Sequence, residues 1–342
     1  MNEPLNVAAR QFRLRAYPVK TVDSTTWQLT SDAAAAPLAG QLLVRNRWLS
    51  VDPGMRGWIT PKRSYIPPVQ PGEVMRAFGV AEVLHSNAEG FKSGDVVTGF
   101  TGVQTLGLVD AKTVRKIDLR YATAQQYLSG LGMTGYTAYF GLLDVGKPQA
   151  GQTVVVSAAA GAVGSIVCQI AKIKGCRVVG IAGGKEKTQY LMDTLGLDAV
   201  VDYKAGSISD ALKAAAPQGI DLYFDNVGGE ILDTVLMQIN RHARIVVCGG
   251  ISQYLDMERA RGPANYLQLI AQSATMQGFT MRDYMGRVPE AFMALAGWQA
   301  KGEVKFREHV LQGIESFPQA FEMLFSGGNQ GKLLIQLDSE TA

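Results

Sequence analysis

The residues best suited to chemistry lie in the segment 153–175, which reads TVVVSAAAGAVGSIVCQIAKIKG. An apolar strand leads into a turn of small residues, and an amphipathic helix follows, as in dinucleotide-binding folds. Ala159, Gly161 and Gly164 occupy the three small positions of the fingerprint G-x-G-x-x-G, with alanine replacing its first glycine. Gly161 would let the backbone approach a pyrophosphate, and Gly164 would let the helix pack on the strand. The segment favours nucleotide binding over a merely tight strand-to-helix turn.

The end of the next predicted strand indicates which dinucleotide is preferred. An NAD site carries an acid there, about twenty residues after the glycines, to hold the ribose hydroxyls. Gly183 and Gly184 stand in that place, and Lys185 and Lys187 follow. Their ammonium groups suit a 2′-phosphate, so the pattern favours NADPH over NADH. The alternative is the solvated start of a helix, where the helix dipole would favour Glu186 whatever the ligand.

Other catalytic chemistries lack their residues. The three histidines are far apart in the sequence, and neither H-E-x-x-H nor G-x-S-x-G occurs, which argues against a zinc protease and an α/β-hydrolase. A dehydrogenase zinc site needs thiolate or imidazole ligands. The first 128 residues contain no cysteine and only one histidine, His85. We therefore expect no metal.

Composition narrows the class of protein. The chain has 342 residues, about twice the usual domain size, which predicts two domains. Hydrophobic residues make up 47% and charged residues 18%, so a largely disordered chain is excluded. The 33 basic and 30 acidic side chains are scattered, and we expect no nucleic-acid partner.

The sequence also indicates the cellular compartment. Three cysteines, Cys168, Cys176 and Cys248, make a disulfide framework improbable, and the first residues do not resemble a secretory signal. A reducing cytoplasm is the simpler setting. The uncharged segment 154–171 contains Ser157, Gln169 and two glycines, so we expect no membrane span.

The periodicity of residues 130–300 predicts an α/β fold. Short β-branched runs alternate with longer helical ones, which is typical of a doubly wound six-stranded parallel sheet with crossover helices. The predicted strands are residues 153–157, 177–182, 199–203, 221–226, 244–248 and 275–279.

Residues 1–128 differ from the α/β segment, because proline and glycine are frequent and helical periodicity is scarce. Segments such as QLLVRNRWLSV predict an antiparallel sheet or barrel. The tail GKLLIQLD reads as one more strand, which would return to this first domain. We therefore expect a mainly-β domain of residues 1–128 completed by 305–342, and a nucleotide-binding domain of residues 129–304.

Several motifs resemble a known family. AAAGAVG, DNVGG and CGGISQY occur in the order seen in zinc-independent medium-chain dehydrogenase/reductases. LSVDPGMRGW, GMTGYTAYFGLLDVGKP, KGCRVVGIAGG and GGNQGK resemble its branch of prostaglandin reductases, alkenal double-bond reductases and curcumin reductases. The resemblance extends over nearly the whole chain. It implies a Rossmann domain with a GroES-like catalytic domain, NADPH-dependent reduction of the carbon–carbon double bond of enones or enals, and a homodimer joined through the Rossmann domains.

The resemblance also implies which residues bind the cofactor. The pyrophosphate would lie on the turn at Gly161 and Gly164, and the 2′-phosphate on Lys187 and Tyr203, which agrees with the charge argument. Asn226 could instead be a simple strand-end turn. The implied cofactor-binding residues are Gly161, Ala162, Val163, Gly164, Lys187, Tyr203, Asn226, Cys248, Gly249, Gly250, Ile251, Ser252, Tyr254, Phe279, Thr280, Met281 and Asn329.

Reduction of an enone puts negative charge on the carbonyl oxygen, so donors should face that oxygen. Tyr254 resembles the family tyrosine near the nicotinamide ribose and is the first catalytic candidate; Tyr65 is the second. Either could be a surface or packing residue. The predicted substrate pocket holds Gly54, Met55, Tyr65 and Tyr254. Relatives commonly carry a tyrosine where this chain has Gly54, which leaves room for a larger or differently shaped substrate.

Two alternative functions stay open. Quinone reduction would use the same fold and hydride donor, and a non-catalytic NADPH-binding protein would use the same turn. The aromatic residues near the predicted pocket favour a small hydrophobic substrate, whose identity the sequence does not reveal.

Overall fold

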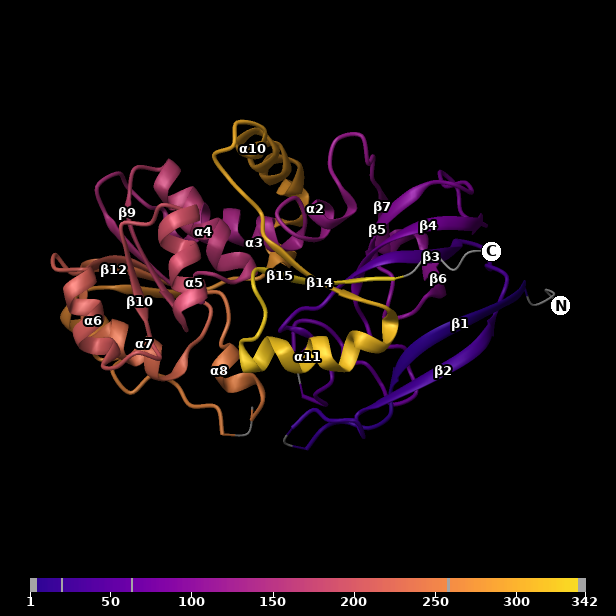
Figure 1. The fold of residues 1–342 in the computed structure, drawn as a ribbon, viewed down its shortest axis with the longest axis horizontal. Helices are drawn as coiled ribbons and strands as arrows, with labels where there is room; N and C mark the ends of the chain where they lie inside the picture. Colours follow the sequence, from indigo (N-terminus) through magenta and orange to yellow (C-terminus); the bar gives the residue numbers. More distant parts are fainter. Residues whose placement is uncertain (1–4, 20, 63, 257–258, 338–342) are drawn as a thin grey trace. The chain divides into compact units, whose positions relative to one another are not determined.

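The computed structural model describes residues 5–19, 21–62, 64–256 and 259–337 (Figure 1). The chain folds into two compact units, which are described separately. Unit 1 comprises the residues up to Leu128, Glu308–Asn329 and the residues from Leu333 on, and unit 2 comprises Ser129–Arg307 and Gln330–Lys332. Residues 305–307 and 330–332 thus group with unit 2. The domain limits inferred from the sequence stay a prediction.

Unit 2 is built on a six-stranded sheet of order β10-β9-β8-β11-β12-β13. Every neighbouring pair is parallel, which confirms the doubly wound sheet that the sequence predicts, in the strand order 3-2-1-4-5-6 of a Rossmann fold. All six strands overlap the predicted ones, although β12 begins earlier than expected. The strands are β8 (Thr153–Ser157), β9 (Arg177–Ala182), β10 (Ala199–Asp202), β11 (Ile220–Asp225), β12 (Ile239–Val247) and β13 (Thr275–Gly278).

The central strands β8, β9 and β11 are buried on both faces, whereas the edge strand β13 is largely exposed. Val155 of β8, Val179 of β9 and Tyr223 of β11 are neighbours across the sheet. They pack into one core with Leu212 and Leu236 of the covering helices. The residues between them on the strands are buried as well, which explains the uninterrupted apolar runs. The helices are α3 (Met133–Phe140), α4 (Ala162–Ile173), α5 (Lys185–Gln189), α6 (Ile208–Ala215), α7 (Gly229–Leu236), α8 (Ile251–Tyr254), α9 (Gln268–Ala271) and α10 (Val288–Ala300), with π-helical η2 (Gly141–Gly146) and η3 (Tyr190–Thr194) and 3-10 helical η4 (Met281–Arg287).

Unit 1 is mainly β, as predicted. A hairpin pairs β1 (Leu5–Leu14) with β2 (Trp27–Ala34). A second sheet has the order β14-β15-β3-β4-β5-β7, with β6 also paired to β3. Its strands are β3 (Gln41–Ser50), β4 (Phe78–Ser86), β5 (Val96–Phe100), β6 (Leu106–Asp110), β7 (Val114–Lys116), β14 (Glu308–Gln312) and β15 (Lys332–Gln336). Its helices are α1 (Met55–Trp58), η1 (Ala111–Thr113), α2 (Ala124–Leu128), η5 (Ile314–Ser316) and α11 (Phe317–Ser326).

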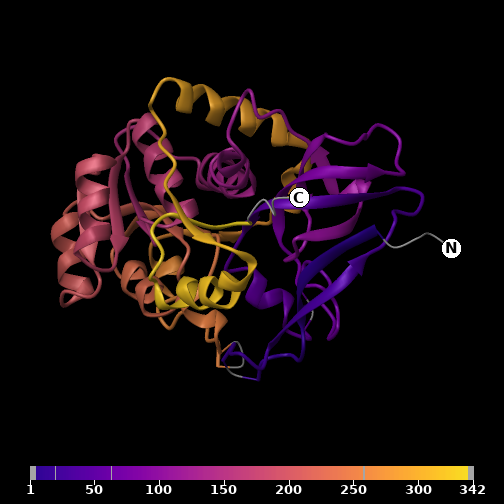
Figure 2. The ribbon, with the colours of Figure 1, turned by 45° about the vertical axis from the view of Figure 1, so that its right-hand side comes forward.

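Residues from the N-terminal and C-terminal parts of the sequence pack together in the core of unit 1. Trp27 of the N-terminal hairpin packs edge-on against Phe317 and Phe321 of α11, with ring centroids 5.0 and 5.5 Å apart. Strand β15 pairs antiparallel with β3, so the C-terminal tail adds a strand to the sheet of the N-terminal segment (Figure 2). Unit 1 therefore closes with residues from both ends.

Within the described ranges, no helix has the length and apolar character needed to cross a membrane. The uncharged segment 154–171 forms most of β8, the following turn and most of α4. Its lack of charge reflects burial inside unit 2.

Candidate functional site

The predicted pyrophosphate turn joins the end of β8 to the start of α4. Gly161 is the N-cap residue of α4, and its backbone N–H donates to the carbonyl oxygen of Ala158 at 2.8 Å. A Cβ atom on Gly164 would lie 2.3 Å from that same oxygen, so a side chain there would push the helix away from the turn. The first amides of α4 have no partner within the helix and, with the helix dipole, favour an anion at this end. The turn, which includes Ala162 and Val163, has the local geometry that a pyrophosphate site needs.

The C-terminal part of unit 2 lies beside this turn. Gly161 forms an isolated parallel β-bridge with Gly331. Gly331 has a φ of +76°, and a Cβ atom there would lie 2.1 Å from the backbone oxygen of Arg307. Glycine is needed at this position for both reasons. The segment Gln330–Lys332 is thus fixed between Arg307 and the turn.

The end of β9 carries glycines where an NAD site would carry an acid. The ring of Tyr203 packs on Gly183, where a Cβ atom would lie 2.7 Å from the ring carbons. The N–H of Gly184 donates to Asp202 Oδ1 at 3.0 Å, and the N–H of Lys204 donates to the same oxygen at 2.9 Å. Asp202 therefore ties the two turns together through backbone amides, and the edge of the site is formed by glycine and an aromatic ring.

Lys187 follows on α5 and is half-buried. Burial lowers its pKa, and the nearby charges of Lys204 and Arg307 lower it further, whereas Glu186 raises it. These effects show that several cations lie close to this lysine. Such a cluster is favourable for a bound dianion, which relieves the mutual repulsion.

A buried carboxylate organises the ends of β8 and β11. Oδ1 of Asp225 accepts four hydrogen bonds, from the hydroxyls of Ser157 (3.1 Å) and Tyr223 (2.8 Å) and from the backbone N–H of Val227 (3.0 Å) and Gly228 (2.9 Å). Within the described part of the chain, its Oδ2 has no hydrogen-bond partner. Burial raises the pKa of Asp225, although these hydrogen bonds oppose the shift. The turn that holds Asn226 is therefore tightly fixed, and the Asn226 side chain donates to the backbone oxygen of Ser157 at 2.8 Å.

The loop after β12 is bonded to that same turn. The N–H groups of Cys248 and Gly249 donate to the backbone oxygen of Asp225, and that of Ile251 donates to Asn226. The hydroxyl of Ser252 donates to the backbone oxygen of Val227 at 2.6 Å. The structure thus brings Asn226 and the predicted loop 248–252 together at one edge of the sheet.

Tyr254 lies at the end of α8 and folds back over this loop. Its hydroxyl oxygen accepts a hydrogen bond from the N–H of Gly250 at 3.0 Å. Burial, with the charge of Asp225 second, raises the pKa of the Cys248 thiol to about 12. Cys248 therefore stays protonated and is no nucleophile at neutral pH, which leaves Tyr254 as the candidate for proton chemistry in this loop.

Phe279, Thr280 and Met281 follow the edge strand β13 and are partly buried. The Phe279 ring meets Tyr284 edge-on at 6.2 Å and lies where a Cβ atom on Gly141 would be 2.5 Å away. Asn329 groups with unit 1, directly before the segment that bridges to the pyrophosphate turn. Their assignment to the cofactor stays a prediction.

The predicted substrate residues of unit 1 also gather locally. A Cβ atom on Gly54 would lie 3.5 Å from the hydroxyl oxygen of Tyr65, and the Trp58 indole N–H donates to that oxygen at 3.4 Å. Tyr65 is 51% exposed, whereas Met55 is fully buried in the core. Gly54 and Tyr65 therefore share one surface region. The Met55 side chain contributes to packing, and its place in a substrate pocket stays a prediction.

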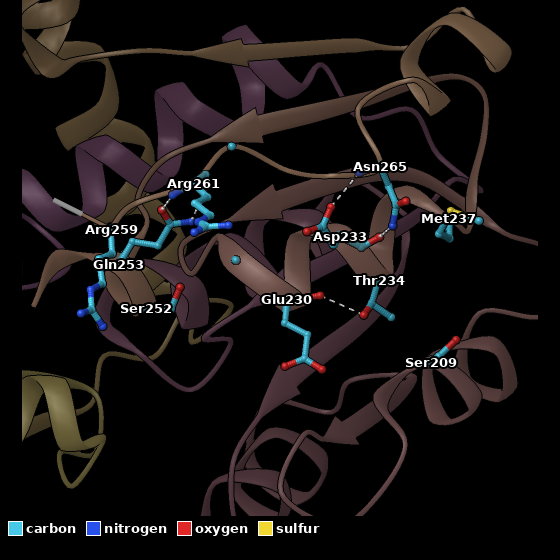
Figure 3. A pocket seen from close by; sticks show the side chains of 12 residues that line it. Ser209, Glu230, Asp233, Thr234, Met237, Ser252, Gln253, Arg259, Arg261 and Asn265 are labelled. Carbon is cyan, nitrogen blue, oxygen red and sulfur yellow. Dashed lines mark hydrogen bonds between the residues drawn. The ribbon is translucent and has the colours of Figure 1, made fainter. Parts of the chain in front are cut away.

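A separate surface pocket of about 560 Å³ lies on unit 2 along α7 and the segment that follows α8 (Figure 3). Of the predicted site residues, only Ser252 lines it. Asp233 accepts the backbone N–H of Asn265 at 2.9 Å, and Gln253 exchanges two hydrogen bonds with the backbone of Arg261. These polar side chains hold the segment in place, and apart from Ser252 the pocket shares no lining residue with the predicted cofactor site.

Some residues around the site were not found by sequence analysis. Asp225 stands inside the DNVGG motif, but nothing in the motif shows that its carboxylate takes four donors. Arg307 contacts Glu186 and Tyr190, which are too far away in the sequence for any spacing rule. Gln330 lies in the GGNQGK motif, which is the one signal that could have pointed to it.

Two family models match the chain. The model described as the N-terminal domain of oxidoreductase matches residues 10–117, and the model described as zinc-binding dehydrogenase matches residues 162–297. Within the described residues, no group of three or more His, Cys, Asp or Glu side chains is placed to hold a metal ion. A site without metal remains what the sequence predicts.

Individual relatives match over most of their length. The NADPH-dependent curcumin reductase of Escherichia coli (strain K12) is 39% identical over 96% of this chain and 96% of its own. The NADP⁺-dependent 2-alkenal reductase of Nicotiana tabacum is 41% identical over 88% of this chain and 89% of its own. The crystal structure of CurA from Vibrio vulnificus in complex with NADPH has a TM-score of 0.91 at 41% identity, covering 96% of this chain and 99% of that one.

Proposed function

Because the chain belongs to the zinc-independent branch of the medium-chain dehydrogenase/reductase family, we propose that it is an NADPH-dependent reductase of the carbon–carbon double bond in α,β-unsaturated ketones or aldehydes. The observation that carries the proposal is the pairing of a glycine turn fit for a pyrophosphate with an end of β9 where Gly183 and Gly184 replace the acid of an NAD site and Lys185 and Lys187 follow. Relatives named for curcumin and 2-alkenals, each near 40% identity, support the reaction class.

The cofactor choice follows from residues of unit 2. The end of β9 presents Gly183, the ring of Tyr203 and the half-buried Lys187, where an NAD site would hold a carboxylate. A 2′-phosphate would be attracted by the cations here and would meet no acid at Gly183. A structural neighbour at 41% identity is a complex with NADPH.

Bound NADPH would supply the hydride that goes to the β-carbon of the substrate. The residues of the chain must then stabilise negative charge on the carbonyl oxygen and deliver a proton to the α-carbon. We assign Tyr254 to proton delivery or to cofactor orientation, because its hydroxyl is already placed on the loop 248–252 by Gly250. Tyr65 is the second donor of the proposal.

The substrate preference rests on unit 1. Relatives commonly have a tyrosine at the position of Gly54. Because this chain has glycine there, position 54 places no ring beside the Tyr65 hydroxyl. Trp58, Phe100 and Phe78 form an aromatic group beside this region, with the Trp58 and Phe100 rings 5.8 Å apart. We therefore expect aryl or bulky enones to be accepted.

The test follows the loss of NADPH absorbance with three substrates: an aliphatic 2-alkenal, the aryl enone benzylideneacetone, and a quinone. Turnover of the enal or enone, with the saturated carbonyl as product and little activity with NADH, would support the proposal. Turnover of the quinone alone would replace it with quinone reduction. Tight NADPH binding without turnover of any of the three would point to a non-catalytic NADPH-binding protein.

We also propose a homodimer formed through unit 2. In the described part of the chain β13 pairs only with β12, so its other edge is open. Leu267 and Ile270, which precede β13 in the chain, are 58% and 76% exposed. Strand pairing between two copies would cover both features. Sedimentation analysis would test this, since Ile270→Glu should shift the protein toward monomer. A cytoplasmic location remains part of the proposal.

A further inference from the structure

Arg307 has an unusual set of neighbours at the end of unit 2. Its guanidinium carbon lies 4.5 Å from the centroid of the Tyr190 ring, and a guanidinium nitrogen lies 3.5 Å from Glu186 Oε1. Gln330 accepts a hydrogen bond from Arg307 and donates one to Glu186. The Arg307 side chain is 27% exposed, whereas Glu186 is 69% exposed. The arginine is therefore well packed, and its charge is balanced by one solvated carboxylate.

The backbone places this arginine beside the predicted cofactor turn. The oxygen of Arg307 accepts the N–H of Lys332 at 2.8 Å, and Gly331, which directly precedes Lys332, bridges to Gly161. Glu186 and Tyr190 belong to α5 and η3, the helical segment that starts at the glycines ending β9. Arg307 thus lies between the pyrophosphate turn and the predicted 2′-phosphate position.

Three cations converge on this position. Lys187 is next to Glu186 on α5 and interacts electrostatically with both Arg307 and Lys204. The Lys204 ammonium lies 5.9 Å from the centroid of Tyr203, whose ring covers Gly183. Two carboxylates lie among these three cations: Glu186 beside Arg307, and Asp202, whose Oδ1 accepts the N–H groups of Gly184 and Lys204, so the local charge is still positive. A dianionic phosphate would complete the balance, and a neutral ribose hydroxyl would not.

We propose that Arg307 is a further specificity-determining residue, whose guanidinium binds the 2′-phosphate of NADPH. This inference rests on the proposed NADPH dependence. In the free protein Glu186 pairs with the guanidinium; on binding, the phosphate takes over that contact because it carries more charge and matches the planar fork of donors. Tyr190 holds the plane of the guanidinium in place in both states.

The test compares Arg307→Met with Arg287→Met. Arg287 is a matched control: its guanidinium carbon lies 5.0 Å from the Phe140 ring centroid, and it pairs with Glu290 and Asp144 in the same unit. NADPH and NADH are titrated against each variant by nucleotide fluorescence. Arg307→Met should weaken NADPH binding about tenfold and NADH binding less than about twofold. Arg287→Met should change neither.

Two further variants keep the test decisive if Arg307→Met folds poorly. Glu186→Gln removes the competing carboxylate and should tighten NADPH binding about twofold. Arg307→Lys keeps the charge without the fork and should fall between wild type and Arg307→Met. Adenosine 2′,5′-bisphosphate and AMP, used as probes in place of the dinucleotides, should show the same ratios.

Three results would overturn the assignment. Equal loss of NADPH and NADH affinity in Arg307→Met would mean that the arginine only supports the turn. Unchanged affinity for both would mean that it does not reach the phosphate, and weaker NADPH binding in Glu186→Gln would contradict the competition. Wild-type protein that binds NADPH and NADH equally would instead overturn the proposed cofactor itself, which separates the two failures.

Discussion

Unit 1 and unit 2 both build a sheet, but they do so under different constraints. In unit 2 five parallel strand pairs lie between layers of helices, and each central strand is buried on both faces. In unit 1 strand β3 pairs antiparallel with β4, β6 and β15, and its pairing with β4 shifts register twice, near Val44 and near Trp48. A sheet covered on both sides tolerates little variation, whereas an irregular one can re-aim side chains at its bends.

The two kinds of sheet carry different parts of the predicted site. The predicted cofactor contacts lie mostly on the carboxyl ends of the regular strands of unit 2, where backbone amides and glycines fix the geometry. The predicted substrate contacts Gly54 and Tyr65 lie on short loops of unit 1. Changes at the glycines of unit 2 should therefore affect cofactor binding and stability, changes at Tyr254 of unit 2 should affect turnover, and changes in unit 1 should affect selectivity. The following variants test that division.

The largest effect is expected for Gly164→Val in unit 2. Its Cβ atom would lie 2.3 Å from a backbone oxygen, which cannot move without displacing α4 from β8. The free energy of unfolding should fall by about 3 kcal/mol, and NADPH binding should be lost. Thermal denaturation and nucleotide titration measure both. Gly297→Ala, where a Cβ atom meets nothing within 4 Å, is the control and should retain binding.

Tyr254→Phe should act on turnover without acting on the fold. The hydroxyl accepts one hydrogen bond from the N–H of Gly250, and the ring is only partly buried. If the hydroxyl moves or orients the proton, kcat should fall about a hundredfold while the melting temperature changes little. Full kcat in this variant would show that Tyr254 has no catalytic role.

Gly54→Tyr in unit 1 should change which substrate is preferred. The Cβ atom of the new side chain would lie 3.5 Å from the Tyr65 hydroxyl, so the added ring would change the surroundings of Tyr65. Relative kcat/KM values for aliphatic and aryl enones should change about tenfold, with the Kd for NADPH unchanged. Equal kcat/KM ratios in the variant and the wild type would mean that position 54 does not shape the pocket.

The smallest effect concerns acid stability. Hydrogen bonds from Arg120 lower the pKa of the partly exposed Asp118 in unit 1 from 3.8 to about 2. The ionised Asp118 contributes to the stability of the fold above pH 3.8, and this contribution is lost as the pH falls through about 2. Asp118→Asn should therefore lower the melting temperature slightly at neutral pH and leave it unchanged at pH 2. The buried Asp225 in unit 2 has a raised pKa, so its effect on stability has the opposite pH dependence. Its contribution to the free energy of unfolding falls as the pH rises through the raised pKa. Melting temperatures of Asp118→Asn and wild type across this range test the sign.

The fold of unit 2 could be predicted because local sequence and burial agree there. Runs such as TVVVS and RVVGIA are apolar nearly throughout, and a glycine turn or a helix follows each. In unit 1 the same rules indicate strands, but they do not place β6 and β15 on β3, because antiparallel partners depend on distant residues.

The candidate site shows the same limit. The turn at Gly161 and the lysine-rich end of β9 are local motifs, so sequence analysis finds them. Arg307 and the four donors on Asp225 are brought together by folding, over separations that no spacing rule covers. Met55 stands in a motif that suggests a pocket, but the fold places its side chain in the core.

The bridge from Gly161 to Gly331 also has a consequence for synthesis on the ribosome. The chain emerges from its N-terminus, so β8, the turn and α4 are released long before Gly331 is translated. β3 must likewise wait for β15 before its sheet is complete. A nascent chain can therefore form β8, the turn and α4 early, but the turn gains its bridge only after Gly331 has left the exit tunnel. Truncation before Gly331 should accordingly remove both the bridge to the nucleotide turn and the buried strand β15, so it should impair cofactor binding and the folding of unit 1 together.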